Sequence, residues 1–145
     1  MKPYIMKTEA EVNKKEKKPV RVKSVIDKLI SGMLPGCTKK GNFIVNSVCP
    51  ELRMMIDENI LALVIGNLIN DAIKFTENDS LEVSSSGRGE IIVSSKKFSL
   101  AKNRSFIVCV DALQIVAQRF GAPVSITGSF ENGTVLSVHF EKIAA

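Results

Sequence analysis

The sequence predicts an α/β domain in which three helices alternate with short strands. The longest periodic segment, residues 57–77, has no proline and one glycine, and its apolar residues recur at helical spacing. Short apolar runs bounded by turn-forming residues stand on both sides of this segment and are typical of strands. With 145 residues, 45% of them hydrophobic, the chain is long enough for one domain with an apolar core.

The remaining elements follow from apolar spacing and from turn residues. A helix is predicted over residues 23–34, and we expect it to stop at Pro35-Gly36 because proline disrupts a helix. A third helix, over residues 106–120, is apolar enough to be buried. Strands are predicted at 20–22, 42–47, 52–56, 81–85, 90–95, 124–129 and 135–140. The turns SGRG and ENGT join the last four strands into two hairpins.

The net charge of +5 is concentrated at the beginning of the sequence. Residues 1–24 hold eight basic and three acidic residues, and in the remainder the two kinds are equal in number. A nucleic-acid-binding domain is expected to carry a basic face on its folded part. We therefore expect no nucleic-acid partner, and we interpret residues 1–19 as a flexible basic leader and residues 20–145 as the folded domain.

Composition also excludes other classes of site. The sequence has no run of 18 uncharged apolar residues and no apolar core of a secretion signal, so it predicts no membrane contact. Its three cysteines form no C-x-x-C pair and fit a reducing compartment, and we expect a cytoplasmic location. His139 is the single histidine and is expected to be structural, since one histidine forms neither a metal cluster nor a catalytic pair.

The predicted helix over residues 57–77 carries a polar face in its last two turns. Asn67, Asn70, Asp71 and Lys74 recur at positions i, i+3, i+4 and i+7, which places them on one side of the helix. Such a face is either solvated or binds a ligand, and periodicity alone leaves both interpretations open.

This face lies within the string NLINDAIKF, which resembles the N-box of the histidine-kinase-like ATPases. The closing string GAPVSITGSFENGTVLSVHF resembles the end of the same domain, with its Gly-Thr pair at Gly133 and Thr134. The resemblance covers about residues 20–141. It implies the Bergerat fold of that family, a two-layer α+β sandwich with three helices on one face of a mixed, mainly antiparallel sheet of five or more strands.

The resemblance also implies where a nucleotide would bind. Asp71 stands at the position of an asparagine that ligates Mg²⁺ in the family, and its carboxylate would take that role only if nucleotide binds. Ser95 stands at the position of an aspartate that accepts a hydrogen bond from adenine. The expected remnant of the nucleotide site comprises Asn67, Asn70, Asp71, Lys74, Ser95, Gly133 and Thr134.

Two glycine motifs that the family uses for nucleotide binding are missing. After Ser95 the sequence continues with Lys96-Lys97, where the family pattern Asp-x-Gly-x-Gly has glycines. The apolar run 107–110 replaces the G-x-G that turns backbone N–H groups onto the phosphates. The loop between the two motifs is shorter than the lid of the kinases. We expect bulky apolar side chains from this region to fill the former site: Phe98, Leu100, Phe106 and Ile107.

These departures predict a domain that has lost ATP binding. We expect no cofactor, no assigned catalytic residue, and a pseudokinase role through protein contacts in bacterial two-component-type signalling. Its partner would be a histidine-containing dimerisation domain or a response regulator. The alternative is a divergent sensor histidine kinase catalytic domain that still binds Mg-ATP and phosphorylates a histidine on another domain or chain.

The leader gives the first testable prediction. Residues 1–19 contain few apolar side chains, too few to offset an ordering entropy of about 1–2 kcal/mol per residue. Deleting them should leave the melting temperature, followed by circular dichroism, nearly unchanged. A fall of more than about 5 °C would correspond to over 1 kcal/mol and would show that the segment packs on the domain.

Overall fold

The computed structural model describes residues 19–96, 104–119, 124–129 and 133–140. Most of the predicted leader, most of the loop before the third predicted helix, and the turn around Asn132 lie outside these residues. The elements follow in the order β1 (Val20–Arg21), α2 (Val22–Lys39), β2 (Phe43–Ser47), β3 (Arg53–Met54), α3 (Glu58–Lys74), β4 (Ser80–Ser85), β5 (Ile91–Ser95), α4 (Arg104–Arg119), β6 (Val124–Ser129) and β7 (Thr134–Phe140).

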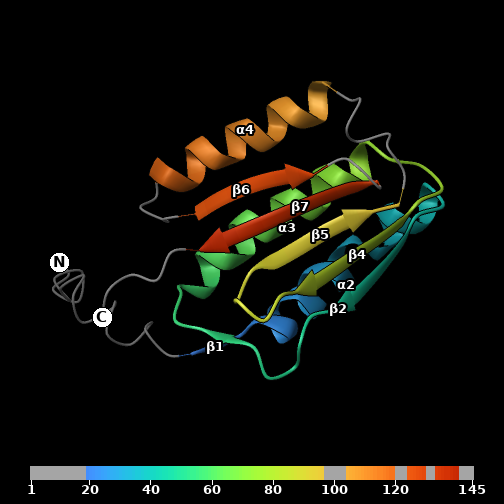
Figure 1. The fold of residues 1–145 in the computed structure, drawn as a ribbon. Helices are drawn as coiled ribbons and strands as arrows, with labels where there is room; N and C mark the ends of the chain where they lie inside the picture. The colour runs from blue at the N-terminus through green and yellow to red at the C-terminus, as the bar shows by residue number, and fades with distance from the viewer. Residues whose placement is uncertain (1–18, 97–103, 120–123, 130–132, 141–145) are drawn as a thin grey trace, which may run out of the picture.

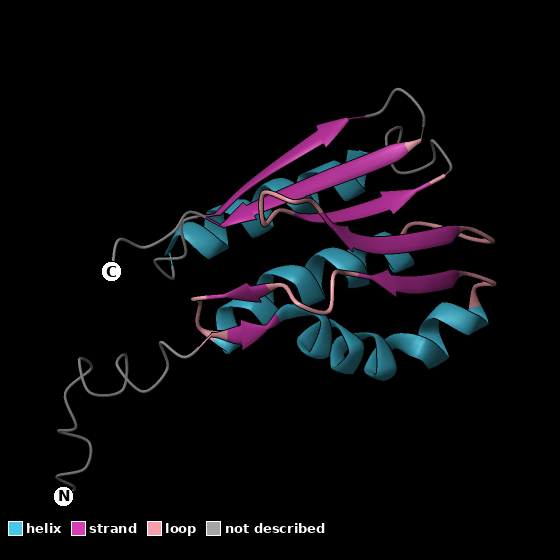
Figure 2. Cartoon of the chain, turned by 60° about the horizontal axis from the view of Figure 1, so that its bottom comes forward, coloured by secondary structure: helices cyan, strands magenta, loops and turns pink. Residues whose placement is uncertain are grey.

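The main sheet has five strands in the order β2-β4-β5-β7-β6. Strand β2 pairs with β4 in parallel, and the other three pairs are antiparallel. Helices α2 and α3 cover one face of the sheet, and α4 packs against α3 and β6 (Figures 1 and 2). The prediction of a two-layer α+β sandwich with a mixed, mainly antiparallel sheet is confirmed. The segments 20–22 and 52–56 are shorter than predicted, and as β1 and β3 they form a separate two-stranded sheet.

The core lies between the helices and the covered face of the sheet. Alternate residues of β4, β5 and β7 point into it, as the two-residue period of a strand requires. The predicted apolar stripe of α3 is fully buried against them: Leu61, Ile65, Leu68, Ile69 and Ala72. The long predicted helix therefore packs as its periodicity indicated.

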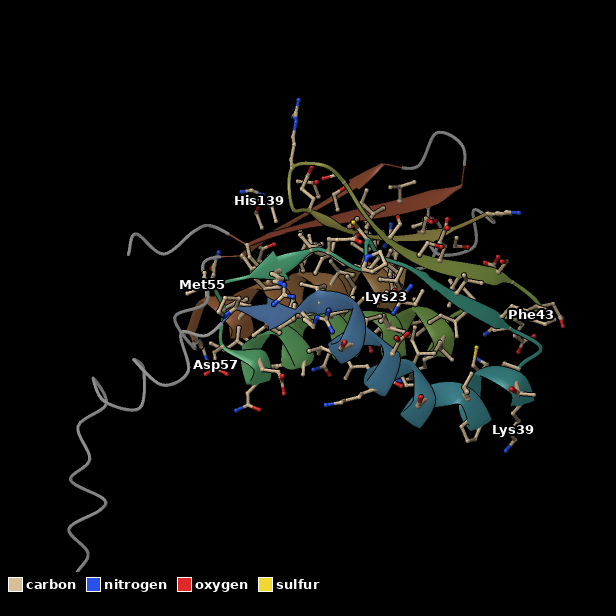
Figure 3. The ribbon with its side chains drawn as sticks, turned by 90° about the horizontal axis from the view of Figure 1, so that it is seen from below. Lys23, Lys39, Phe43, Met55, Asp57 and His139 are labelled. Carbon is tan, nitrogen blue, oxygen red and sulfur yellow. The ribbon has the colours of Figure 1, made fainter. Side chains whose placement is uncertain are left out.

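Side chains supply hydrogen-bond partners for backbone groups at both ends of α3. At its start the Asp57 carboxylate accepts a hydrogen bond from the backbone N–H of Asn59 at 2.7 Å (Figure 3). At its end the ammonium of Lys40 donates to the carbonyl oxygens of Ile73 and Lys74. A cation at this position also complements the negative end of the helix dipole. The helix ends at Lys74, three residues before the predicted limit.

Helix α2 contradicts the prediction that Pro35 ends it, because the helix continues to Lys39. Proline removes one helical N–H, but the next turn makes contacts that compensate for this loss. Cys37 in that turn is buried in the core, and its thiol donates to the carbonyl oxygen of Asn42 at 3.3 Å. Gly41, with φ of +71°, then closes the helix by donating its N–H to Thr38 at 2.9 Å.

Helix α4 contradicts the prediction that the third helix is buried. Its inner side contributes Phe106, Leu113 and Ala117 to the core, whereas Val108 and Ile115 are exposed on the outer side. The error arises because the first turns of this helix are apolar all round. Its sequence alone therefore does not indicate which side packs against α3.

Side chains form hydrogen bonds with backbone groups at the two edges of the main sheet. At the β6 edge the Gln114 amide pairs with the strand backbone, donating to the carbonyl of Val124 at 2.7 Å and accepting from the N–H of Ile126 at 3.0 Å. At the β2 edge the Lys23 ammonium donates to the carbonyl of Asn46 at 3.0 Å (Figure 3). The Asn46 amide donates back to the carbonyl of Lys23 at 3.1 Å. Edges occupied in this way are poor templates for another strand.

Replacing Gln114 by leucine should destabilise the domain. The substitution roughly keeps the volume but leaves Val124 and Ile126 without the amide, which costs about 1–3 kcal/mol for partly buried groups. Urea unfolding measures this loss as a lower midpoint with an unchanged slope. Gln118→Leu, an exposed position of the same helix, is the matched control, and equal midpoints for the two variants would contradict the role given to Gln114.

Candidate functional site

The polar face of α3 is accessible in the structure. Asn67, Asn70 and Lys74 are exposed and Asp71 is partly exposed. The Asn67 amide donates to the carbonyl of Leu63 at 2.6 Å, within its own helix. The four predicted helix residues therefore share one face, as expected from their spacing.

Asp71 is the single acidic residue of this face. Partial burial raises the pKa of its carboxyl, and the nearby Lys74 charge lowers it in part. Partial burial therefore makes the charged form less favourable than in a fully hydrated carboxylate. The Lys74 ammonium lies 5.4 Å from the centroid of the Phe75 ring, a cation–π distance.

The buried polar side chains of the described residues gather at one end of the sheet, where α3 finishes. Each has at most 5% of its surface exposed: Asn42, Thr76, Asp79, Ser95 and Thr134. We call these five residues the polar cluster. They come from the starts of β2, β4 and β7, from the end of β5, and from the segment after α3.

Asn42 joins the helix to the sheet within this cluster. Its amide nitrogen donates to the carbonyls of Ile73 at 3.4 Å and Thr76 at 3.2 Å, at the end of α3. Its amide oxygen accepts from the backbone N–H of Asp79 at 3.0 Å, next to β4. One side chain thus links the backbone at the end of α3 to the backbone next to β4.

Asp79 brings a carboxylate next to Ser95. The carboxylate accepts hydrogen bonds from the backbone N–H of Ser80 at 2.7 Å and from the Ser95 hydroxyl. Ser95 occupies the position at which the resemblance implies an adenine-binding aspartate. In this chain a carboxylate lies beside that position, but it belongs to the residue before the adjacent strand β4 and accepts a hydrogen bond from the serine hydroxyl.

The three sheet residues of the predicted site are close together. Ser95 and Thr134 stand opposite each other in the β5–β7 register. Gly133 has φ of +103°, and a Cβ at this position would collide with the carbonyl oxygen of Ser95. Glycine is therefore required by the close approach of the two strands.

The seven predicted residues thus form two groups, one exposed on α3 and one buried at the strand ends. Sequence reasoning missed the residues between them, Asn42 and Asp79. The available signal was positional: each immediately precedes a strand, and β2 and β4 pair in parallel with Phe43 opposite Ser80. The sequence alone does not show that β2 and β4 pair in parallel, and therefore it does not show that Asn42 and Asp79 are close together.

Of the four apolar residues expected to fill the former nucleotide site, the structure shows Phe106 buried. Phe106 is 1% exposed, and its ring meets that of Phe75 edge-on, with 6.1 Å between centroids and 70° between planes. Ile107 was expected to be buried and is exposed, because the helix turns it away from α3. Phe98 and Leu100 lie outside the described residues.

Surface hollows also occur away from the predicted site. One of about 460 Å³ lies beside Arg21 and Asp57, and one of about 810 Å³ lies beside Lys40 and Glu77. None of the seven predicted residues lines either hollow. Within the described ranges there is no group of three side chains suited to a metal ion and no helix long and apolar enough to cross a membrane. His139 is exposed on β7 (Figure 3).

The comparisons identify the fold. No family model matches the sequence, and no curated protein matches it. Among solved structures, the catalytic domain of histidine kinase ThkA is similar at a TM-score of 0.65 and 16% identity, over 86% of this chain and 95% of that domain. The cytoplasmic segment of histidine kinase QseC is similar at 0.62 and 10% identity, over 87% of this chain and 78% of that segment.

A third similar structure is full-length ShkA in complex with AMPPNP, with a TM-score of 0.57 and 20% identity. The match covers 88% of this chain and 32% of ShkA, so the chain spans about a third of that protein. The architecture described above is therefore shared with the catalytic domains of histidine kinases. At these identities the likeness establishes a histidine-kinase-like ATPase fold.

Phe106→Ala should destabilise the domain by about 3–5 kcal/mol, because it removes a fully buried ring and its contact with Phe75. Chemical denaturation measures the loss. Val108→Ala, two residues along on the exposed side of α4, serves as the control and should change stability by less than about 0.5 kcal/mol. Similar losses for the two variants would show that the ring does not anchor α4.

Proposed function

We propose that this chain is a histidine-kinase-like ATPase domain that has lost useful ATP binding and acts through protein contacts in two-component-type signalling. The observation that supports this most is the pairing of Ser95 with Asp79 inside the polar cluster. An adenine at this place would have to disrupt a buried hydrogen bond and open a region whose polar residues are all at least 95% buried. Breaking this hydrogen bond and exposing these polar groups would cost free energy and would weaken the binding of adenine.

The position of α4 supports the same proposal. Its sequence from Ile107 to Val110 stands where the resemblance implies a phosphate-binding G-x-G. In the structure these residues are helical, and those beyond the first turn, Val108, Cys109 and Val110, use their N–H groups within the helix. A helix interior offers no free amides to a phosphate, unlike a glycine-rich loop.

The combined loss of these hydrogen bonds would weaken nucleotide binding strongly. Each lost hydrogen bond to a nucleotide costs about 1–3 kcal/mol, so losing the adenine acceptor and the phosphate amides removes roughly 4–6 kcal/mol. This corresponds to a dissociation constant about 10³ to 10⁴ times higher. We place the protein in the cytoplasm, with a histidine-containing dimerisation domain or a response regulator as its partner.

A second candidate function rests on the accessible face of α3. Asn67, Asn70 and Lys74 are exposed, and Asp71 is partly so. These residues would be available to Mg-ATP, with the Asp71 carboxylate as a magnesium ligand. In that case the chain would be a divergent catalytic domain that phosphorylates a histidine on another domain or chain.

Titration calorimetry of the full chain with Mg-ATP distinguishes the two functions. We expect a dissociation constant above about 1 mM, equivalent to less than about 4 kcal/mol of binding free energy. Asp71→Asn, which restores the residue typical of the N-box, should not produce binding, because the closed polar cluster remains. Sub-millimolar binding that is lost in Asn67→Ala would overturn the proposal and favour the second candidate.

A further inference from the structure

The outer side of α4 is the most apolar helix surface that the described residues expose. Val108 is 64% exposed and Ile115 52%, with Ile107 and Val116 at their margins. Four of the eight large exposed apolar side chains of the described residues lie on this one helix. We call the surface formed by Val108, Ala112 and Ile115 the α4 outer face. An exposed contiguous apolar surface of this kind indicates a binding partner more often than scattered apolar residues do.

The spacing of this face fits a helical partner. Val108 and Ile115 are seven residues apart, so they lie on the same side of α4 about 10 Å apart along its axis. The small Ala112 between them allows a second helix to approach closely. Two apolar anchors at this spacing form the seam of a helix–helix contact. Addition of a strand is disfavoured, because Gln114 and Lys23 already occupy backbone groups of the two sheet edges.

Charges at the two ends of the face indicate what kind of helix fits. Arg104 is four residues before Val108, and Arg119 is four residues after Ile115, and both arginines are exposed. Residues four apart on a helix lie on the same side, so each anchor has a cation one turn beyond it. An acidic residue at each end of the partner's apolar seam would complement this arrangement.

The same charges disfavour a second copy of this chain. In an antiparallel pair of α4 helices, Arg104 of one copy would meet Arg119 of the other, and the exposed Asp111 side chains would meet near the centre. In a parallel pair each arginine would face its own counterpart. Both arrangements place like charges together, which weakens association.

We propose that the α4 outer face docks an amphipathic helix of another protein that carries acidic residues at both ends of its apolar seam. The inference rests on the proposed function, because it specifies the surface and the partner chemistry through which a domain without ATP would signal. The arginines select the partner, and Val108 and Ile115 supply the apolar contact.

Two synthetic helical peptides with the same leucine seam test this proposal. One has glutamate at both ends and the other has lysine, and fluorescence anisotropy with the full chain gives their affinities. We expect the glutamate peptide to bind at least about tenfold more tightly, with the difference shrinking between about 50 and 500 mM salt. Equal affinities at low salt would overturn the charge selection.

Variants of the chain locate the binding surface. Val108→Asp should weaken binding of the glutamate peptide at least about tenfold, as loss of a central apolar anchor does. Leu34→Asp, at an exposed apolar position of α2, is the matched control and should leave binding unchanged. The double variant Arg104→Glu, Arg119→Glu should reverse the preference towards the lysine peptide. An unreversed preference, or binding by Val108→Asp equal to that of Leu34→Asp, would overturn the proposal.

Sedimentation velocity of the unmodified chain addresses self-association. A dimer that disappears in Val108→Asp would overturn the assignment in favour of a second copy of this chain. The peptide results are independent of the Mg-ATP titration, so the two proposals fail separately. Sub-millimolar ATP binding would contradict the proposed loss of nucleotide binding but would not contradict the proposed docking at the α4 outer face. A failed peptide test would contradict the docking proposal alone.

Discussion

The attachment of the end of α3 to the sheet is the constraint on which the rest of the structure depends. The last carbonyl groups of a buried helix need donors, and here Asn42 and Lys40 supply them from the segment that leads into β2. The Asn42 amide oxygen also binds the N–H of Asp79, and the carbonyl of Asp79 accepts from Phe43 at 2.8 Å. The same contacts therefore hold the helix, fix the parallel register of β2 with β4, and place the Asp79 carboxylate beside Ser95.

This arrangement links the proposed loss of nucleotide binding to the stability of the fold. The polar cluster lies where the helix layer and the sheet meet, and it includes Ser95, the position that the resemblance implies for the contact with adenine. A carboxylate that is buried and hydrogen-bonded to Ser95 contributes to the core rather than to an open site. Solved kinase domains at 10–20% identity share the architecture, which depends on apolar patterning. The chemistry at the strand ends depends on a few polar residues and changes independently of that patterning.

Local sequence patterns predicted the helices and strands well, but they predicted less well which residues of these elements are buried and which segments are neighbours. The stripe of α3 was predictable because one apolar side of a long helix packs in one way, and the hairpin of β4 and β5 followed from its glycine turn. The error at Pro35 came from a tertiary effect, since burial of Cys37 holds the last turn of α2. The exposure of Ile107 and the role of Asp79 depended on which segments become neighbours. Spacing along the chain does not contain that information.

The residues that occupy the sheet edges have a consequence for synthesis of the chain. Lys23 precedes β2, and Gln114 precedes β6, so each leaves the ribosome before the strand whose backbone it binds. Because synthesis runs from the N-terminal end, the segment bearing the binding residue has already been made when either edge strand emerges. The interval in which an unpaired strand can meet another nascent chain on the same messenger is thereby shortened at both sides of the sheet.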